Sequence, residues 1–135
     1  MEKKVLVLDD EKEIRHILKE TFSLEGYTVV TAQSSEKALK AAKEENFPVM
    51  FVDLNLPGMD GVSFCREVKE RNPINCIHAM SGFGIAFGLK EILDTGFDDY
   101  FIKPFAIKDL INAARYSFEK IARWESNKKT GHLSW

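Results

Sequence analysis

Five short apolar runs, separated by longer segments with a different spacing of apolar residues, constrain the fold of this chain most strongly. The runs are rich in β-branched and aromatic residues, which is typical of buried strands. They occupy residues 5–8, 27–31, 49–52, 74–80 and 100–102. Between them, apolar residues recur three or four positions apart, as at Ile14, Ile17 and Leu18, which is the pattern of helices with one buried face. The chain therefore alternates predicted strands and predicted helices.

This alternation predicts an α/β fold with a doubly wound, five-stranded parallel sheet. Parallel strands need crossover connections, which helices provide. Runs that are apolar throughout are expected where helices cover both faces of the sheet. The length of 135 residues fits one domain, and we assign residues 1–123 to it and residues 124–135 to a polar C-terminal tail. The last predicted helix starts at Ile107 and can continue through Trp124, after which residues 125–135 are expected to be loosely ordered.

The composition excludes several classes of protein. The 19 Lys and Arg residues against 21 Asp and Glu residues give a net charge of -2, which offers no basic field for nucleic-acid phosphates. Cys65 and Cys76 are too few for a disulfide framework and lack the spacing of metal ligands. The apolar runs are too short for a membrane span or a signal-peptide core. We expect a cytoplasmic protein that binds neither nucleic acid nor membrane directly.

Polar residues stand where the predicted strands end. Asp9 and Asp10 follow the first run, Asp53 the third, Ser81 the fourth and Lys103 the fifth. In doubly wound sheets the carboxyl ends of the strands share one edge, where ligands bind. Clustered carboxylates repel one another and need a cation, and oxygen ligands without His or Cys suit Mg²⁺ or Mn²⁺. Acids that only cap helices could explain Asp9 or Asp10, but they leave Ser81 and Lys103 unexplained.

Four segments around these positions form a specific pattern: VLVLDDE at residues 5–11, VDLNLPGMDG at 52–61, MSG at 80–82 and DDYFIKPF at 98–105. In their order and separation they resemble the receiver domain of response regulators in two-component signal transduction. The resemblance covers about residues 3–123. It implies the flavodoxin-like strand order 2-1-3-4-5 with five helices. It fits a stand-alone receiver like the chemotaxis regulators, or a receiver cut from a longer chain.

The resemblance also implies roles for the acidic residues. Asp53 is expected to be the phospho-acceptor, whose carboxylate attacks a phosphoryl group carried on a histidine of a sensor kinase or phosphotransfer protein. Asp10 and Asp53 are expected to bind Mg²⁺, or Mn²⁺, directly, together with the backbone carbonyl of Asn55. Asp9 is expected to act on the ion through a water molecule. Phosphoryl transfer needs such groups because it depends on positioning and on neutralising the phosphoryl oxygens.

The remaining roles concern contacts with the phosphoryl oxygens and the surface that passes the signal to a partner. By resemblance, Lys103 and Ser81 contact phosphoryl oxygens, and the Lys103-Pro104 peptide is cis as in many relatives. Ser81 and Tyr100 are expected to form the switch pair, which changes the face made by the fourth helix, fifth strand and fifth helix. That face is expected to bind a downstream protein or to form a weak dimer of an otherwise monomeric chain. Asn55 and Phe83 are expected to set the lifetime of the phosphoryl group.

Two other functions use a similar set of residues. A phosphatase of the haloacid dehalogenase type has an aspartate nucleophile and Mg²⁺, but it needs a second aspartate where Asn55 stands. A receiver-like interaction module would have lost phosphorylation and would bind partners without it. The complete set of acidic residues, Ser81 and Lys103 argues against such a loss. We therefore expect a signalling domain rather than an enzyme that turns over substrate.

The fourth strand departs from the family pattern, in which this strand is usually an unbroken apolar run. Cys76 and His78 stand in its middle. A histidine on a buried strand needs a hydrogen-bond partner, so we expect His78 to be a hydrogen-bonded core residue rather than a relay. Cys76 is expected to act as a small core residue.

Overall fold

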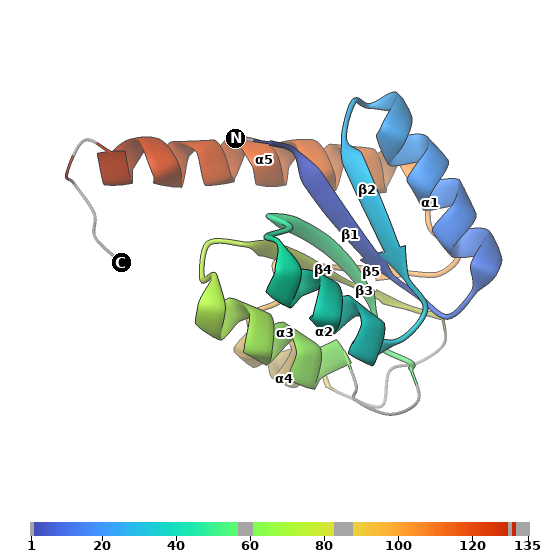
Figure 1. The fold of residues 1–135 in the computed structure, drawn as a ribbon. Helices are drawn as coiled ribbons and strands as arrows, with labels where there is room; N and C mark the ends of the chain where they lie inside the picture. The colour runs from blue at the N-terminus through green and yellow to red at the C-terminus, as the bar shows by residue number, and fades with distance from the viewer. Residues whose placement is uncertain (1, 57–60, 83–87, 130, 132–135) are drawn as a thin grey trace.

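Strands and helices alternate along the whole chain, as predicted (Figure 1). The computed structural model describes residues 2–56, 61–82, 88–129 and 131. The strands are β1 (Lys4–Leu8), β2 (Thr28–Ala32), β3 (Val49–Asp53), β4 (Cys76–Ser81) and β5 (Asp99–Ile102). The helices are α1 (Lys12–Leu24), α2 (Ser35–Glu44), α3 (Gly61–Arg71), α4 (Leu89–Thr95) and α5 (Ile107–Lys129).

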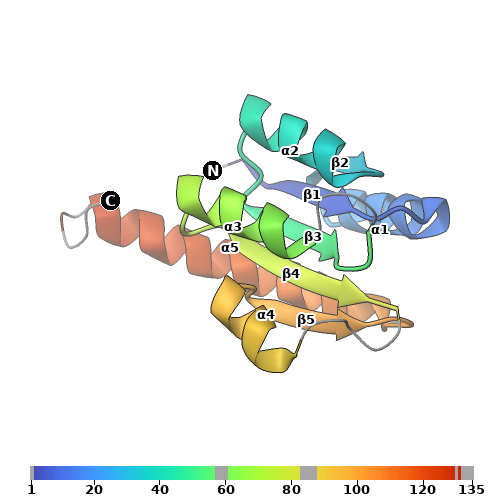
Figure 2. The ribbon, with the colours of Figure 1, turned by 90° about the horizontal axis from the view of Figure 1, so that it is seen from below.

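The five strands form one parallel sheet in the order β2-β1-β3-β4-β5. Helices α1 and α5 cover one face, and α2, α3 and α4 cover the other (Figure 2). All arrowheads point towards the same edge of the sheet, which therefore carries the carboxyl ends of the strands. The doubly wound α/β fold and the strand order expected from the sequence are both confirmed.

Buried side chains form a separate core on each face of the sheet. In β1, Val5 and Val7 pack with α1 and α5, whereas Leu6 and Leu8 pack with the helices of the opposite face. Successive side chains of a strand point to opposite faces, so a strand covered on both sides must be apolar throughout. This requirement explains why the central strands are continuous apolar runs.

Helix α5 is longer than the sequence pattern indicated. It extends through Lys129, so residues 125–129 are helical, and the expectation that they are loosely ordered was wrong. Ile121 packs into the core, and the helix continues beyond the sheet (Figure 1). Lys128 and Lys129 in the last turn interact favourably with the carbonyl end of the helix. No helix in the described ranges of the chain is long and apolar enough to cross a membrane.

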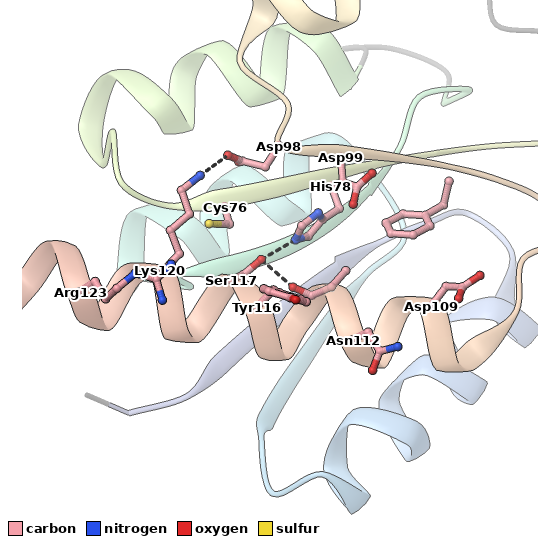
Figure 3. A pocket seen from close by; sticks show the side chains of 12 residues that line it. Cys76, His78, Asp98, Asp99, Asp109, Asn112, Tyr116, Ser117, Lys120 and Arg123 are labelled. Carbon is pink, nitrogen blue, oxygen red and sulfur yellow. Dashed lines mark hydrogen bonds and ion pairs between the residues drawn. The ribbon is translucent and has the colours of Figure 1, made fainter.

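A buried polar pair connects β4 to α5 (Figure 3). His78 Nε2 lies 2.8 Å from Ser117 Oγ, and the Ser117 hydroxyl donates to the carbonyl oxygen of Ala113, also at 2.8 Å. Because a hydroxyl has a single proton to donate, the imidazole must donate at Nε2, which leaves Nδ1 as an acceptor. Among the described residues, Nδ1 has no hydrogen-bond partner. The prediction of a hydrogen-bonded core histidine is confirmed.

The surroundings of His78 keep the imidazole neutral. The ring stacks on Phe51 with 4.8 Å between the ring centroids and meets Phe101 edge-on. Burial lowers the pKa of His78 to about 4, although the nearby carboxylates of Asp98 and Asp99 act in the opposite direction. A proton on this ring would place a charge in the core between the sheet and α5.

Candidate functional site

The predicted site residues lie at the carboxyl edge of the sheet. Asp9 directly follows β1, Asp53 ends β3, Ser81 ends β4 and Lys103 directly follows β5. The parallel register pairs Leu8 with Val52, so the aspartates that come next in the two strands are neighbours. The fold therefore brings together residues from the ends of four strands, as predicted from the sequence.

Three carboxylates form the centre of the site. Asp9, Asp10 and Asp53 each offer an oxygen, and these oxygens lie within 4.8 Å of one another. Asp9 is fully buried and Asp53 is 3% exposed, whereas Asp10 faces solvent. Backbone N–H groups hold one oxygen of each buried carboxylate: Glu11 N lies 2.8 Å from Asp9 Oδ1, and Asn55 N lies 2.8 Å from Asp53 Oδ1. The second oxygen of each remains for contacts within the cluster.

The ammonium group of Lys103 provides the positive charge within this cluster. Lys103 Nζ lies 2.7 Å from Asp9 Oδ2, 3.4 Å from Glu11 Oε1 and 3.5 Å from Asp53 Oδ2. Burial by itself lowers the pKa of Lys103, but the close Asp9 carboxylate, followed by Asp53 and Glu11, outweighs it, so the pKa lies above its usual value. Lys103 therefore stays charged. The Lys103-Pro104 peptide is cis, as the resemblance implied.

Two effects act on the pKa of Asp9 in opposite directions. Burial raises the pKa of this carboxyl, and the ammonium group of Lys103, 2.7 Å from Oδ2, acts against that rise. Asp9 Oδ2 is buried and, among the described residues, accepts no hydrogen bond of good geometry, although it is ion-paired with Lys103. A buried carboxylate oxygen with one cation beside it, in a cluster of oxygen donors only, fits a hard divalent cation such as Mg²⁺ or Mn²⁺.

Ser81 is buried at the end of β4, and its hydroxyl donates to Asn55 Oδ1 at 2.8 Å. Tyr100 lies on neighbouring β5 and is half-buried against the core formed with α2, α3 and α4. The register pairs Tyr100 with Ala79, and residues two apart on a strand share a face. Ser81 and Tyr100 therefore lie on the same face of adjacent strands. Phe83, the other residue expected to affect the phosphoryl group, lies outside the described residues.

Three further residues, whose roles were not predicted from the sequence, support the site. Glu11, in the quoted VLVLDDE segment, lies beside Lys103. Arg15, one turn into α1, donates to the backbone carbonyl of Asp9 at 2.9 Å. The spacing of four residues between Glu11 and Arg15 can be seen in the sequence. The contact of Arg15 with a backbone carbonyl, however, leaves no pattern in the sequence.

The third is Gly61, the first residue of α3, which permits a close approach of this helix to the end of β3. A Cβ atom at Gly61 would lie 2.9 Å from Leu54 Cδ2 and 3.0 Å from the carbonyl oxygen of Asp53. Side chains rarely tolerate such distances, so a larger residue requires the Asp53 backbone or α3 to shift. Gly61 thus helps to position the buried carboxylate.

A doubly wound parallel sheet with an acidic cluster, a lysine and a serine at its carboxyl edge defines the class of receiver domains. Over residues 5–115 the chain matches the family described as "Response regulator receiver domain". The chain belongs to this family, whose members act in two-component signal transduction.

Curated relatives and solved structures agree with this assignment. The chain is 33% identical over 124 residues to the probable transcriptional regulator ycf27 of Porphyridium aerugineum, covering 92% of this chain and 51% of that protein. It is 31% identical over 110 residues to the transcriptional regulatory protein ResD of Bacillus subtilis, covering 82% of this chain and 45% of that protein. The chain thus spans about half the length of these curated relatives.

Among solved structures, a response regulator receiver domain protein from Clostridium thermocellum superposes with a TM-score of 0.84 and 27% identity, covering 90% of this chain and 98% of that one. The chemotaxis protein CheY4 of Vibrio cholerae superposes with a TM-score of 0.78 and 27% identity, covering 87% and 99% of the two chains. The likeness extends over nearly the whole length of each structure.

Proposed function

We propose that this chain is a phospho-accepting receiver in which Asp53 takes a phosphoryl group from a histidine of a sensor kinase or phosphotransfer protein. One observation carries the proposal: the buried carboxylate of Asp53 lies beside the ammonium group of Lys103, within a cluster of two further aspartates. Membership of the receiver family supports the same conclusion.

The chemistry follows from how Asp53 is held. Its Oδ1 accepts a hydrogen bond from Asn55 N, which orients Oδ2 towards the cluster as the attacking atom. An O–P bond forms at Asp53 while the P–N bond to the donor histidine breaks, and the departing imidazole takes up a proton from solvent. Lys103 neutralises a phosphoryl oxygen, and Ser81 donates a hydrogen bond to another.

A divalent cation, Mg²⁺ or Mn²⁺, completes the proposed site. The carboxylates of Asp10 and Asp53 and the backbone carbonyl of Asn55 would hold it directly, and Asp9 would act through a water molecule. When bound, such an ion neutralises charge on the phosphoryl oxygens. The oxygen-only donor set of the cluster supports this assignment.

We further propose that phosphorylation acts through Ser81 and Tyr100 on the face formed by α4, β5 and α5. Each of these elements exposes a large apolar side chain: Leu93 is 62% exposed, Ile102 63% and Tyr116 73%. Exposed apolar groups on adjoining elements suit a protein partner. The output is thus a downstream protein or a weak dimer of this chain.

The extent of the domain is also a proposal. We place the receiver domain at residues 1–123 and treat residues 124–135 as an extension, of which the part to Lys129 continues α5. The curated relatives are transcriptional regulators about twice as long, so the chain can act as a stand-alone receiver or as the receiver part of such a regulator. We expect a cytoplasmic signalling domain without substrate turnover.

The proposal is tested by intact-mass measurement after incubation with acetyl phosphate, with and without Mg²⁺. The wild-type chain is expected to gain one phosphoryl group only when Mg²⁺ is present, and Asp53→Asn, which keeps the shape but lacks the nucleophile, is expected to gain none. Asp109→Asn, a surface substitution on α5, serves as the matched control and should behave as wild type.

Two outcomes would contradict this proposal. The absence of any gain in the wild-type chain would favour an interaction module that works without phosphorylation. Steady release of phosphate from small phosphoesters would favour a phosphatase. The presence of Asn55 where a phosphatase needs an acidic group speaks against turnover, and the Asn55 side chain is hydrogen-bonded to Ser81.

A further inference from the structure

Asn55 contacts both the proposed phospho-acceptor and the proposed switch residue. Its backbone N–H donates to Asp53 Oδ1 at 2.8 Å, and its side-chain Oδ1 accepts the Ser81 hydroxyl at 2.8 Å. The two hydrogen bonds join the ends of β3 and β4, which are neighbours in the sheet. One residue therefore links the positions that phosphorylation would change.

The hydroxyl of Ser81 cannot serve Asn55 and a phosphoryl group at once. A serine hydroxyl has one proton to donate, and in this structure it is donated to Asn55 Oδ1. Phosphoryl oxygens only accept hydrogen bonds. A phosphoryl group on Asp53 therefore competes with Asn55 for the same proton.

We propose that the Asn55 side chain holds Ser81 in the unphosphorylated arrangement and so sets the balance between the inactive and active states. This inference rests on the proposed function of Asp53 and Ser81. Switching breaks the Ser81–Asn55 hydrogen bond before the hydroxyl reaches the phosphoryl group. A ligand shifts such an equilibrium only by its difference in affinity for the two states. Because the active state lacks the Ser81–Asn55 hydrogen bond, part of the binding free energy of the phosphoryl group is used to break that bond.

The surroundings of the two residues indicate that this restraint is weak and reversible. Ser81 is fully buried, whereas the Asn55 side chain is exposed to solvent. When Ser81 leaves, water can hydrogen-bond to Asn55 Oδ1, so the released amide is not left without a partner. The net contribution of one such hydrogen bond corresponds to about a fivefold change in an equilibrium.

The test measures the affinity for beryllium trifluoride, a mimic of the phosphoryl group, in the presence of Mg²⁺. Four proteins form a double-mutant cycle: the wild-type chain, Asn55→Ala, Ser81→Ala and the double variant. Asn55→Ala is expected to bind the mimic about fivefold more tightly than wild type. In the Ser81→Ala background, where no hydroxyl remains to be held, the same substitution is expected to leave the affinity unchanged.

Further variants separate this role from others. Asn55→Leu also lacks the acceptor and should match Asn55→Ala, and Asn112→Ala, an exposed asparagine on α5, should match wild type.

The outcomes distinguish this inference from the proposed function. An equal effect of Asn55→Ala in both backgrounds would show that Asn55 acts on the ligand directly, and no effect in either would show that it does not restrain Ser81. Both results overturn the inference and leave the phospho-accepting role in place. A wild-type chain that neither binds the mimic nor accepts phosphate would overturn both.

Discussion

Lys103 Nζ lies 2.7 Å from Asp9 Oδ2 and 3.5 Å from Asp53 Oδ2, so one ammonium group neutralises carboxylates from two different strands. The nearer partner is Asp9, which is fully buried. A buried carboxylate is costly unless it is paired. In the absence of a metal ion, Lys103 therefore stabilises the fold as well as serving the proposed chemistry.

Replacing Lys103 by Met should destabilise the metal-free protein. The substitution keeps most of the apolar stem of the side chain but leaves the buried carboxylate of Asp9 without its cation, a loss of about 3 kcal/mol. Urea unfolding without Mg²⁺ measures it. Lys90→Met is the control, because it removes an exposed ion pair with Asp94 and should cost less than about 1 kcal/mol.

Added Mg²⁺ should restore part of the stability lost in Lys103→Met. An ion that binds only the folded state stabilises it by mass action, and removal of the ammonium group takes away a competing positive charge. The Mg²⁺-induced gain in unfolding free energy should be larger in Lys103→Met than in wild type. Equal gains in the two proteins would mean that Lys103 and the cation do not share the same carboxylates.

Replacing His78 by Leu should make the free energy of unfolding depend less on pH in the acidic range. The pKa of His78 is about 4 in the folded chain and about 6.5 in the unfolded one. Between these values the unfolded chain binds the proton and the folded chain does not, so stability falls as the pH falls from about 6.5 to about 4. At pH 5 this linkage costs the wild-type chain about 2 kcal/mol relative to neutral pH.

Urea unfolding at pH 7 and pH 5 measures this effect. The loss of stability between the two pH values should be smaller by about 2 kcal/mol in His78→Leu than in wild type. Ser117 keeps its hydrogen bond to Ala113 in the variant, so no buried hydroxyl is stranded. His16→Gln, an exposed position on α1, should retain the wild-type loss, and an unchanged loss in His78→Leu would contradict the assignment of a neutral buried imidazole.

Replacing Gly61 by Ala should destabilise the fold and slow phosphorylation of Asp53. The added Cβ meets the backbone carbonyl of Asp53 at 3.0 Å, and overpacking of this kind costs about 1–3 kcal/mol. Thermal unfolding and the rate of phosphorylation by acetyl phosphate are the measurements. Gly82→Ala is the control for stability, since a Cβ there meets no atom of the described residues within 4 Å. Wild-type rates in Gly61→Ala would mean that the start of α3 does not position the acceptor.

Much of the fold follows from local pattern in the sequence. Continuous apolar runs such as Val5 to Leu8 require burial on both faces, and helical segments between parallel strands allow only a covered sheet. The location of the acidic cluster follows as well, since the carboxyl ends of parallel strands must share an edge. The need of His78 for a hydrogen-bond partner was also predictable, because a buried imidazole cannot remain unpaired without cost.

Which atoms meet was decided only by the tertiary structure. No periodicity indicates that His78 meets Ser117, that Lys103 lies nearest Asp9, or that Ser81 donates to Asn55. These residues are distant in the chain, and their contacts depend on strand register, on the docking of α5 and on side-chain rotamers. Local sequence determines which residues are apolar, helical or polar, whereas contacts between distant residues form only when the whole sheet and its helices pack together.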